Sequence, residues 1–398
     1  MNIAVIFTKD MTEGGAFQYA LSLSLLLEKN RSDKHNFIFF TTVKKNLEIL
    51  KKHNLLPIYL RWSNLDRFKS LLFGSQIVAN VFAKAKITLE LKLDKIFKSR
   101  GIDLVYFLSP TDLALAVNRY NYLFTVWDLC FLDSMEFPEV YANKQFERRE
   151  ELYRLAAAKS IAVVTDSEAT KAKIIKQYGV SEERIVSLPL LPSNAVSLSG
   201  QSHIDIGKKY GLVNKYIFYP AQFWPHKNHI YILEGIKLLK EKYDIKVDAV
   251  FSGSDKGNLS FILKRAKELG IAEKVHCIGF VEDEELPSLY AQALALVMPT
   301  YFGPTNIPPL EAFFMGCPVL YSDLPGLREQ VKDSALLLDL NDPESLCRGL
   351  IKVLNSGPEI KTMIENGKKR TECLMREDRW SKLRAVFDDY AAKLKCRK

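Results

Sequence analysis

Short apolar runs that alternate with amphipathic stretches dominate the chain. The runs predict strands at 2–7, 36–42, 103–108, 122–128, 160–166, 184–190, 215–221, 247–254, 275–281, 295–300, 318–323 and 334–340. They are hydrophobic almost without interruption, as expected of parallel strands covered on both faces. Apolar residues at helical spacing predict helices between them, including 17–27, 77–97, 143–157, 228–242, 258–269, 284–293, 307–316, 326–332 and 343–355. This alternation predicts an α/β architecture with right-handed crossovers.

One break in the rhythm predicts two domains. Residues 189–211, which include Pro189, Pro192, Gly200 and several serines, are typical of an interdomain linker. We expect Rossmann-like domains over 1–195 and 196–375, facing a central cleft. Residues 376–398 contain an amphipathic helix that we expect to cross back and pack on the first domain. Because open α/β sheets bind ligands beyond the carboxyl ends of their strands, the cleft is the expected site.

The composition is that of an ordinary globular protein. Of the 398 residues, 47% are hydrophobic and 26% are charged, which excludes disorder, collagen and coiled coil. No apolar run reaches the roughly 18 residues of a membrane span, and the first predicted strand follows Met1 without a basic leader. The 6 cysteines are scattered without a CxxC motif, which favours a reducing compartment. We therefore expect a cytoplasmic protein.

The net charge of +9 comes from a single segment, residues 44–100. This segment holds 13 lysines and arginines against 4 acidic residues, and the remaining chain carries 43 of each sign. Apolar residues accompany the lysines at helical spacing, namely Ile77, Val78, Val81, Phe82, Ala85, Leu89, Leu93 and Ile96. The pattern favours contact with an anionic membrane. The alternative is a solvated helix that packs on the first-domain sheet. Nucleic acid is not expected as a partner, because the charge is balanced elsewhere.

The strongest candidate chemistry lies in residues 297–316, VMPTYFGPTNIPPLEAFFMG. A strand ends at Thr300, a Gly/Pro-rich loop follows, and Pro308 and Pro309 predict a helix start. The backbone amides before these prolines then lie beside a helix N-terminus, which suits a diphosphate; they belong to Thr305, Asn306 and Ile307. Glu311 can accept two hydroxyl hydrogen bonds, as a ribose diol would supply. The alternative is a simple helix start with an acidic first turn.

This passage resembles the signature loop of the retaining GT-B glycosyltransferases of family 4, also called glycosyl transferases group 1. In that family a first glutamate is followed, after seven residues, by a second glutamate within a PPLEA-like helix start. Glu311 matches the second glutamate, which holds the ribose of a nucleotide-sugar, whereas Gly303 stands where the first, sugar-contacting glutamate is expected. The resemblance implies that Thr305 and Asn306 contact the donor sugar instead, and that Asn306 and Glu311 are catalytic.

Two further segments occur in the family's order. FYPAQFWPHKNH (218–229) resembles the turn whose basic pair grips the donor diphosphate. Lys227 matches the family lysine, a strong point charge, and Gln222 occupies the place of the arginine. The segment IGFV resembles the one whose backbone meets the nucleobase, which implies contacts at Phe280 and Val281.

In the first domain, TEGGAFQY (12–19) follows the first strand and opens a helix. Gly14 and Gly15 permit close approach to the backbone and resemble the family loop that faces the donor phosphates; a simple tight turn is the alternative. The sequence TVWDL ends a later strand where related enzymes often carry His-Asp. Here Trp127 cannot transfer a proton but can stack on a sugar, and Asp128 can orient an acceptor hydroxyl or merely cap a loop.

The resemblance implies a retaining, metal-independent glycosyltransferase, with its nucleotide-diphosphate sugar on the second domain and a saccharide acceptor on the first. Lys227, helix N-termini and loop amides would stabilise the departing diphosphate, so no divalent metal or other cofactor is expected. The resemblance implies transfer of a hexosyl or deoxyhexosyl unit to a lipid-linked saccharide in bacterial O-antigen or capsule assembly, at the inner face of the cell membrane.

Other functions stay open. His226 and His229 lie three residues apart but lack an acidic or cysteine partner nearby, which argues against a zinc site. A GT-B-fold epimerase or phosphorylase is one alternative. A catalytically degenerate sugar-nucleotide-binding protein is another, suggested by Gly303 and Gln222.

Overall fold

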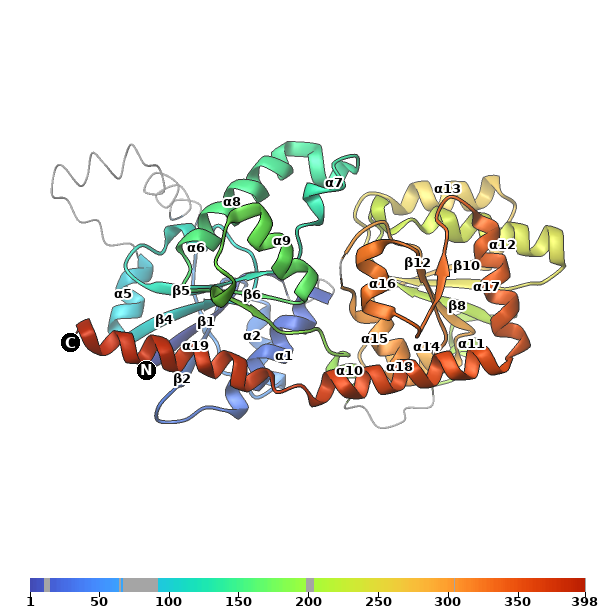
Figure 1. Cartoon of the computed structure of the whole chain (residues 1–398). Helices are drawn as coiled ribbons and strands as arrows, with labels where there is room; N and C mark the ends of the chain where they lie inside the picture. Colours follow the sequence, from blue (N-terminus) through green and yellow to red (C-terminus); the bar gives the residue numbers. More distant parts are fainter. Residues whose placement is uncertain (11–14, 64–65, 67–91, 198–203, 304, 398) are drawn as a thin grey trace. The chain divides into compact units, whose positions relative to one another are not determined.

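The structure, a computed structural model, describes residues 1–397 except 11–14, 64–65, 67–91, 198–203 and 304 (Figure 1). The chain divides into two compact units. The first contains Met1–Leu129, Lys144–Pro189 and Asp378–Lys398, and the second contains Cys130–Asn143 and Leu190–Glu377. Residues 130–143 thus join the second unit, although they lie within the expected first domain. The division at Pro189 also precedes the expected boundary after residue 195.

The first unit is built on a seven-stranded sheet in the order β3-β2-β1-β4-β5-β6-β7, and all its strand pairs are parallel. The strands are β1 (Asn2–Phe7), β2 (Asn36–Thr41), β3 (Ile58–Tyr59), β4 (Ile102–Phe107), β5 (Asn121–Val126), β6 (Ala162–Thr165) and β7 (Ile185–Ser187). Consecutive side chains of β1 are buried, so both faces of the sheet are covered. The sequence predicts all of these strands except β3, whose two residues are too few to show a period.

Helices flank this sheet: α1 (Gly15–Lys29), α2 (Asn46–Lys52), α5 (Lys92–Ser99), α6 (Leu113–Ala116), α8 (Gln145–Lys159), α9 (Glu168–Tyr178) and α19 (Arg379–Leu394). The helix expected at 77–97 lies outside the described residues except for its last turns, which belong to α5.

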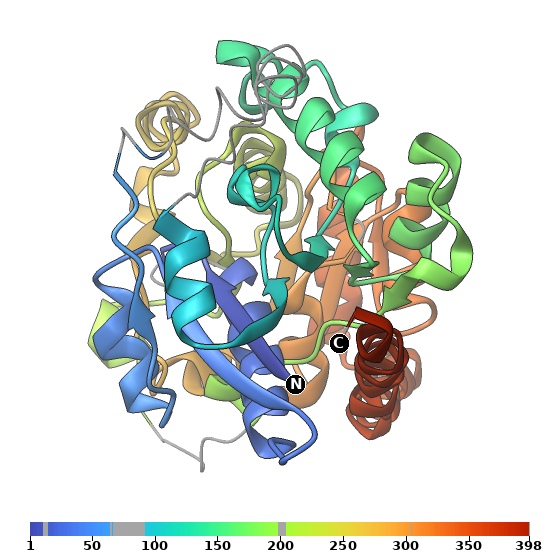
Figure 2. The same cartoon turned by 90° about the vertical axis from the view of Figure 1, so that its left-hand side faces the viewer.

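Helix α19 packs on the first unit, as the sequence predicts (Figures 1 and 2). Asp388 lies 2.7 Å from the buried His35 ring, and the Tyr390 hydroxyl donates to the Asp103 carbonyl at 3.1 Å. The Phe37 ring lies 6.2 Å from Trp380 and 5.8 Å from Phe387, so the apolar face of the helix covers strand β2. This helix is therefore an integral part of the first unit.

The second unit has a six-stranded parallel sheet in the order β10-β9-β8-β11-β12-β13. Its strands are β8 (Tyr216–Pro220), β9 (Asp248–Ser252), β10 (Val275–Gly279), β11 (Ala295–Met298), β12 (Val319–Ser322) and β13 (Leu336–Leu338). Its helices are α7 (Pro138–Tyr141), α10 (Asn194–Ser197), α11 (Ile206–Tyr210), α12 (His229–Tyr243), α13 (Leu259–Glu268), α14 (Leu286–Gln292), α15 (Ile307–Met315), α16 (Pro325–Val331), α17 (Pro343–Asn355) and α18 (Pro358–Arg376). The predicted parallel α/β architecture is thus confirmed in both units.

Two parts of the second unit differ from the sequence interpretation. The described residues of the expected linker, 189–197 and 204–211, include α10 and α11, and Val196 and Ile206 are buried in the core. Their apolar side chains outweigh the Pro/Ser/Gly signal. The sequence also gives no prediction for α18, because two of its buried positions are Gly367 and Thr371, which weaken the apolar stripe.

Candidate functional site

The second unit has its topological switch point between β8 and β11, where the strand order reverses. In parallel α/β sheets, ligands bind at the carboxyl edge of such a point. The loop after β8 carries Lys227, and the loop after β11 carries Gly303 and Asn306 and leads into α15 with Glu311. The fold therefore brings two of the predicted signature segments to one edge of the sheet.

Lys227 lies at the end of a short turn, Pro225–Lys227, before α12. The Tyr219 hydroxyl donates to the Lys227 carbonyl at 2.9 Å, which fixes the backbone at this position. The ammonium group of Lys227 donates to Asn306 Oδ1 at 3.4 Å. Lys227 and Asn306, predicted from separate motifs, thus meet in the structure.

Gly303 and Asn306 shape the loop before α15. Gly303 has a φ of +110°, which disfavours any side chain, and a Cβ there would lie 3.2 Å from the Asn306 carboxamide. Asn306 Nδ2 donates to the Gly303 carbonyl at 3.1 Å. The backbone N–H of Asn306, one of the amides expected to face a diphosphate, donates to Gln330 Oε1 at 3.0 Å. The Asn306 carboxamide therefore lies where a side chain at position 303, the place of the family's first glutamate, would begin.

Glu311 lies on the buried side of α15 with only 4% of its surface exposed. Its Oε2 atom accepts a 2.6 Å hydrogen bond from the hydroxyl of Tyr290 on α14. Burial raises the pKa of Glu311, and hydrogen bonding, including that from Tyr290, opposes the rise. Burying a carboxylate costs free energy unless the carboxylate is hydrogen-bonded, and the Tyr290 hydroxyl supplies such a bond to Glu311.

Gln222, which stands in the place of the family arginine, accepts a 3.0 Å hydrogen bond from the indole N–H of Trp224. The ammonium of Lys256 lies 5.9 Å from the centroid of the Trp224 ring. A parallel bridge between Phe223 and Asp255 joins the two loops. Lys256 is not among the site residues predicted from the sequence.

Phe280 and Val281 follow β10 directly. Phe280 is 66% exposed, and Val281 packs against the core. The N–H of Gly253 donates to the carbonyl of Gly279 at 2.8 Å, which ties the loops after β9 and β10 together. The expected nucleobase contact at these residues stays a prediction.

A buried carboxylate–imidazole pair adjoins Lys227. Glu139, on α7, accepts a hydrogen bond from the His226 backbone N–H at 3.1 Å through Oε1. The same oxygen is hydrogen-bonded to Nδ1 of the His226 ring. The ring of His226 also stacks on Phe302 with centroids 3.8 Å apart. Burial favours a higher pKa for Glu139, but its hydrogen bonds with His226 prevail and hold the pKa below the usual value. The sequence interpretation misses this pair, whose members are 87 residues apart.

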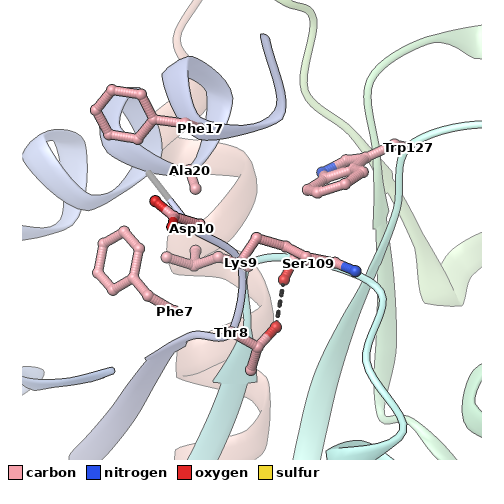
Figure 3. A pocket seen from close by; sticks show the side chains of 9 residues that line it. Phe7, Thr8, Lys9, Asp10, Phe17, Ala20, Ser109 and Trp127 are labelled. Carbon is pink, nitrogen blue, oxygen red and sulfur yellow. Dashed lines mark hydrogen bonds between the residues drawn. The ribbon is translucent and has the colours of Figure 1, made fainter. Parts of the chain in front are cut away.

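The first unit has a pocket at its own switch point, beyond the ends of β1, β4 and β5 (Figure 3). Its lining residues are Phe7, Thr8, Lys9, Asp10, Phe17, Ala20, Leu108, Ser109 and Trp127. The hydroxyls of Thr8 and Ser109 are hydrogen-bonded at 2.7 Å. Figure 3 shows the indole of Trp127 and the ring of Phe17 on opposite sides of the pocket. The Trp127 Nε1 atom is buried and makes no hydrogen bond to the described part of the chain.

Of the other first-unit candidates, Asp128 follows Trp127 immediately after β5, and Gly15 begins α1. Gly14 lies outside the described residues, as does most of the second half of the basic segment. Within the described ranges, no group of three or more His, Cys, Asp or Glu side chains is arranged to hold a metal ion. No helix in those ranges is long and apolar enough to cross a membrane.

The two Rossmann-like units have the fold of GT-B glycosyltransferases. The structure of Anabaena Alr3699/HepE in complex with UDP-glucose matches 98% of this chain and 100% of that chain with a TM-score of 0.72, at 16% identity. WaaG, a glycosyltransferase involved in lipopolysaccharide biosynthesis, matches 96% of this chain and 98% of that chain with a TM-score of 0.68, at 17% identity. At such identities the likeness establishes the fold alone.

Sequence comparison matches part of the second unit to a known family. Residues 207–370 match the family described as glycosyl transferases group 1, and the predicted resemblance is confirmed. The O-antigen chain mannosyltransferase B of Escherichia coli is 28% identical over 230 residues, 56% of this chain. The O-antigen chain mannosyltransferase RfbU of Salmonella typhimurium is 27% identical over 230 residues, 58% of this chain. The chain spans 60% of the length of each relative.

Proposed function

We propose that this protein transfers a glycosyl unit from a nucleotide-diphosphate sugar to a saccharide acceptor. The observation that carries the proposal is the group 1 domain whose signature residues Lys227 and Asn306 meet at the switch point of the second sheet. The named relatives are O-antigen mannosyltransferases, which favours a hexose such as mannose as the transferred sugar and a surface polysaccharide as the product.

The donor would bind to the second unit. Lys227 and the N-terminus of α15 would place positive charge beside the diphosphate, and Glu311 would hold the ribose hydroxyls. Breaking the bond between sugar C1 and the phosphate oxygen moves negative charge onto the diphosphate, so stabilisation of that charge is the main catalytic contribution. No divalent metal is needed for this step.

We propose that the reaction proceeds with retention. The acceptor oxygen then forms its bond to C1 on the face that the diphosphate leaves, and the acceptor proton passes to a donor phosphate oxygen. This route needs no general base from the protein, and it is consistent with Trp127 in the place where related enzymes often carry histidine. The anomeric configuration of the product, determined by NMR, tests it.

The acceptor would bind to the first unit. Its pocket offers aromatic rings on two sides, hydroxyls at Thr8 and Ser109, and the buried indole N–H of Trp127. Aromatic faces and neutral polar groups suit a sugar ring. Asp128, next to Trp127, would orient the attacking hydroxyl.

A lipid-linked acceptor would bring the protein to the inner face of the membrane. Support comes from the basic segment 44–100, of which Lys45, Lys51, Lys52 and Lys98 are exposed in the structure. We expect the protein to float with vesicles that contain anionic lipid and not with neutral vesicles. Equal behaviour with both would argue for a solvated segment and against membrane contact.

A panel of nucleotide-sugars tests the proposed function. Wild-type protein is incubated with uridine- and guanosine-diphosphate hexoses and saccharide acceptors, and the products are separated by mass. Transfer of a hexose supports the proposal. An isomerised donor without transfer would indicate an epimerase, and binding without turnover would indicate a degenerate binding protein.

A further inference from the structure

A buried ring of hydrogen bonds surrounds the Asn306 side chain. Tyr321, at 0% exposure on β12, and Gln330, at 7% on α16, complete it. Asn306 Nδ2 lies 2.6 Å from the Tyr321 hydroxyl, and that hydroxyl lies 3.0 Å from Gln330 Oε1. Gln330 also bonds the backbone of Asn306 twice, through Oε1 at 3.0 Å and Nε2 at 2.6 Å.

The ring allows only one arrangement of donors and acceptors. The backbone of Asn306 has a fixed N–H donor and a fixed carbonyl acceptor, so Gln330 must direct Oε1 to the first and Nε2 to the second. The single proton of the Tyr321 hydroxyl is then donated to Oε1. The hydroxyl oxygen must therefore accept from Asn306, which places Nδ2 towards Tyr321 and the Gly303 carbonyl and leaves Oδ1 facing Lys227.

The same loop excludes the glutamate that the family places at position 303. A residue with a side chain would be strained at a φ of +110°, and its Cβ would press against the Asn306 carboxamide at 3.2 Å. An amide oxygen offers a hydrogen-bond acceptor as a glutamate does. It adds no negative charge beside Lys227, which suits a loop that receives a diphosphate.

We propose that Tyr321 and Gln330 are positioning residues that hold Asn306 Oδ1 as a neutral acceptor for a hydroxyl of the donor sugar, in place of the missing glutamate. This inference rests on the proposed function, because it requires a nucleotide-sugar at Lys227. The inference assigns recognition of the sugar to the hydrogen-bonded ring of Asn306, Tyr321 and Gln330. Recognition of the nucleotide is left to the other loops.

The test separates binding of the sugar from binding of the nucleotide. Calorimetry with Tyr321→Phe measures the affinity for the preferred nucleotide-sugar and for the corresponding nucleoside diphosphate. We expect about a tenfold loss for the nucleotide-sugar and no change for the nucleoside diphosphate, because only the orientation of Asn306 relaxes. Tyr216→Phe is the matched control, since its buried hydroxyl donates to the Leu289 carbonyl at 2.8 Å. It should leave both affinities unchanged.

A double variant shows whether Tyr321 acts through Asn306. In an Asn306→Ala background, Tyr321→Phe should cause no further loss of nucleotide-sugar affinity. A further tenfold loss in the double variant would overturn the inference. So would equal losses of affinity for the nucleotide-sugar and the nucleoside diphosphate in Tyr321→Phe. In either case, binding of the nucleotide-sugar by the wild-type protein would leave the proposed function standing. A wild-type protein that bound no nucleotide-sugar would overturn the proposed function and this inference together.

Discussion

The two units place different chemistry at equivalent points of similar sheets. In the second unit, the carboxyl edge at the switch point carries Lys227 and Asn306 bonded to each other, with Glu311 bonded to Tyr290. In the first unit, the corresponding edge carries aromatic rings and the Thr8–Ser109 hydroxyl pair. The second-unit edge is a network of charged and amide groups. The first-unit edge is a pocket of aromatic rings and hydroxyls, which Lys9 and Asp10 also line.

This difference is consistent with the proposal that the donor binds the second unit and the acceptor the first. A diphosphate requires fixed positive charge and prepared dipoles, and the second unit provides them. A neutral sugar requires flat apolar faces and hydroxyl partners, and the first unit provides those. Variants in the two units should therefore affect different kinetic constants.

The largest effect is expected for Glu311→Ala. Loss of the buried carboxylate removes the proposed ribose contacts and leaves the Tyr290 hydroxyl unpaired, so kcat/KM for the donor should fall by about 1000-fold. Steady-state kinetics with a folded variant checks this. Glu241→Ala, which changes an exposed residue on α12, is the control. Wild-type activity in Glu311→Ala would sink the assignment of the donor site.

Lys227→Ala should lower kcat by about 100-fold, because one fixed charge beside the leaving diphosphate is lost. The KM for the acceptor should stay the same, since the acceptor is assigned to the other unit. Initial rates at varied acceptor concentration measure both constants. A rise in acceptor KM with unchanged kcat would contradict the division of tasks.

The stability of the second unit should fall in acid through His229. This residue is fully buried among Tyr219, Phe223 and Phe251, and burial, reinforced by Lys227 and His226, lowers its pKa to about 3. Because the unfolded chain binds a proton near pH 6.5 and the folded chain does not, stability decreases as pH falls below about 6.5. Between pH 7 and pH 5 the loss should be about 2 kcal/mol.

Urea unfolding at both pH values checks this prediction. In His229→Leu the contribution of this site disappears, so the variant should lose correspondingly less stability between pH 7 and pH 5 than the wild type. An identical pH dependence in the two proteins would show that His229 is not the group responsible.

The smallest effect is expected for Trp127→Ala in the first unit. Removing the indole should raise the KM for the acceptor by about tenfold through lost stacking and a lost N–H donor, with donor affinity unchanged. Acceptor titration at saturating donor measures it. Trp127→Phe keeps an aromatic face and should recover part of the loss, whereas a change confined to donor KM would contradict the assignment.

The sequence predicts the fold well because parallel strands covered on both faces are continuous apolar runs. It also predicts α15, because Pro308 and Pro309 mark its first turn. It does not predict the packing of residues 189–197, where composition suggests a linker and tertiary contacts decide. It finds Lys227, Asn306 and Glu311 through local motifs.

The hydrogen-bond partners of the residues at this site can be identified only from the tertiary structure. Glu139 meets His226 across 87 residues, and Gln330 meets Asn306 across 24. Neither pair has a local spacing that a sequence pattern can show. The sequence identifies Gly303 as a departure from the family, but only its backbone angle and its distance from Asn306 explain why a glutamate does not fit there.

The discontinuous composition of the two units has a consequence for biosynthesis. Residues 378–398 belong to the first unit but leave the ribosome after the whole of the second. The hydrogen bond between His35 and Asp388 can therefore form only after 353 more residues have been synthesised. During translation the face of the sheet around Phe37 therefore lacks its covering helix while the rest of the chain is made. The nascent first unit exposes apolar surface over that interval, so chaperone demand should peak before α19 is synthesised.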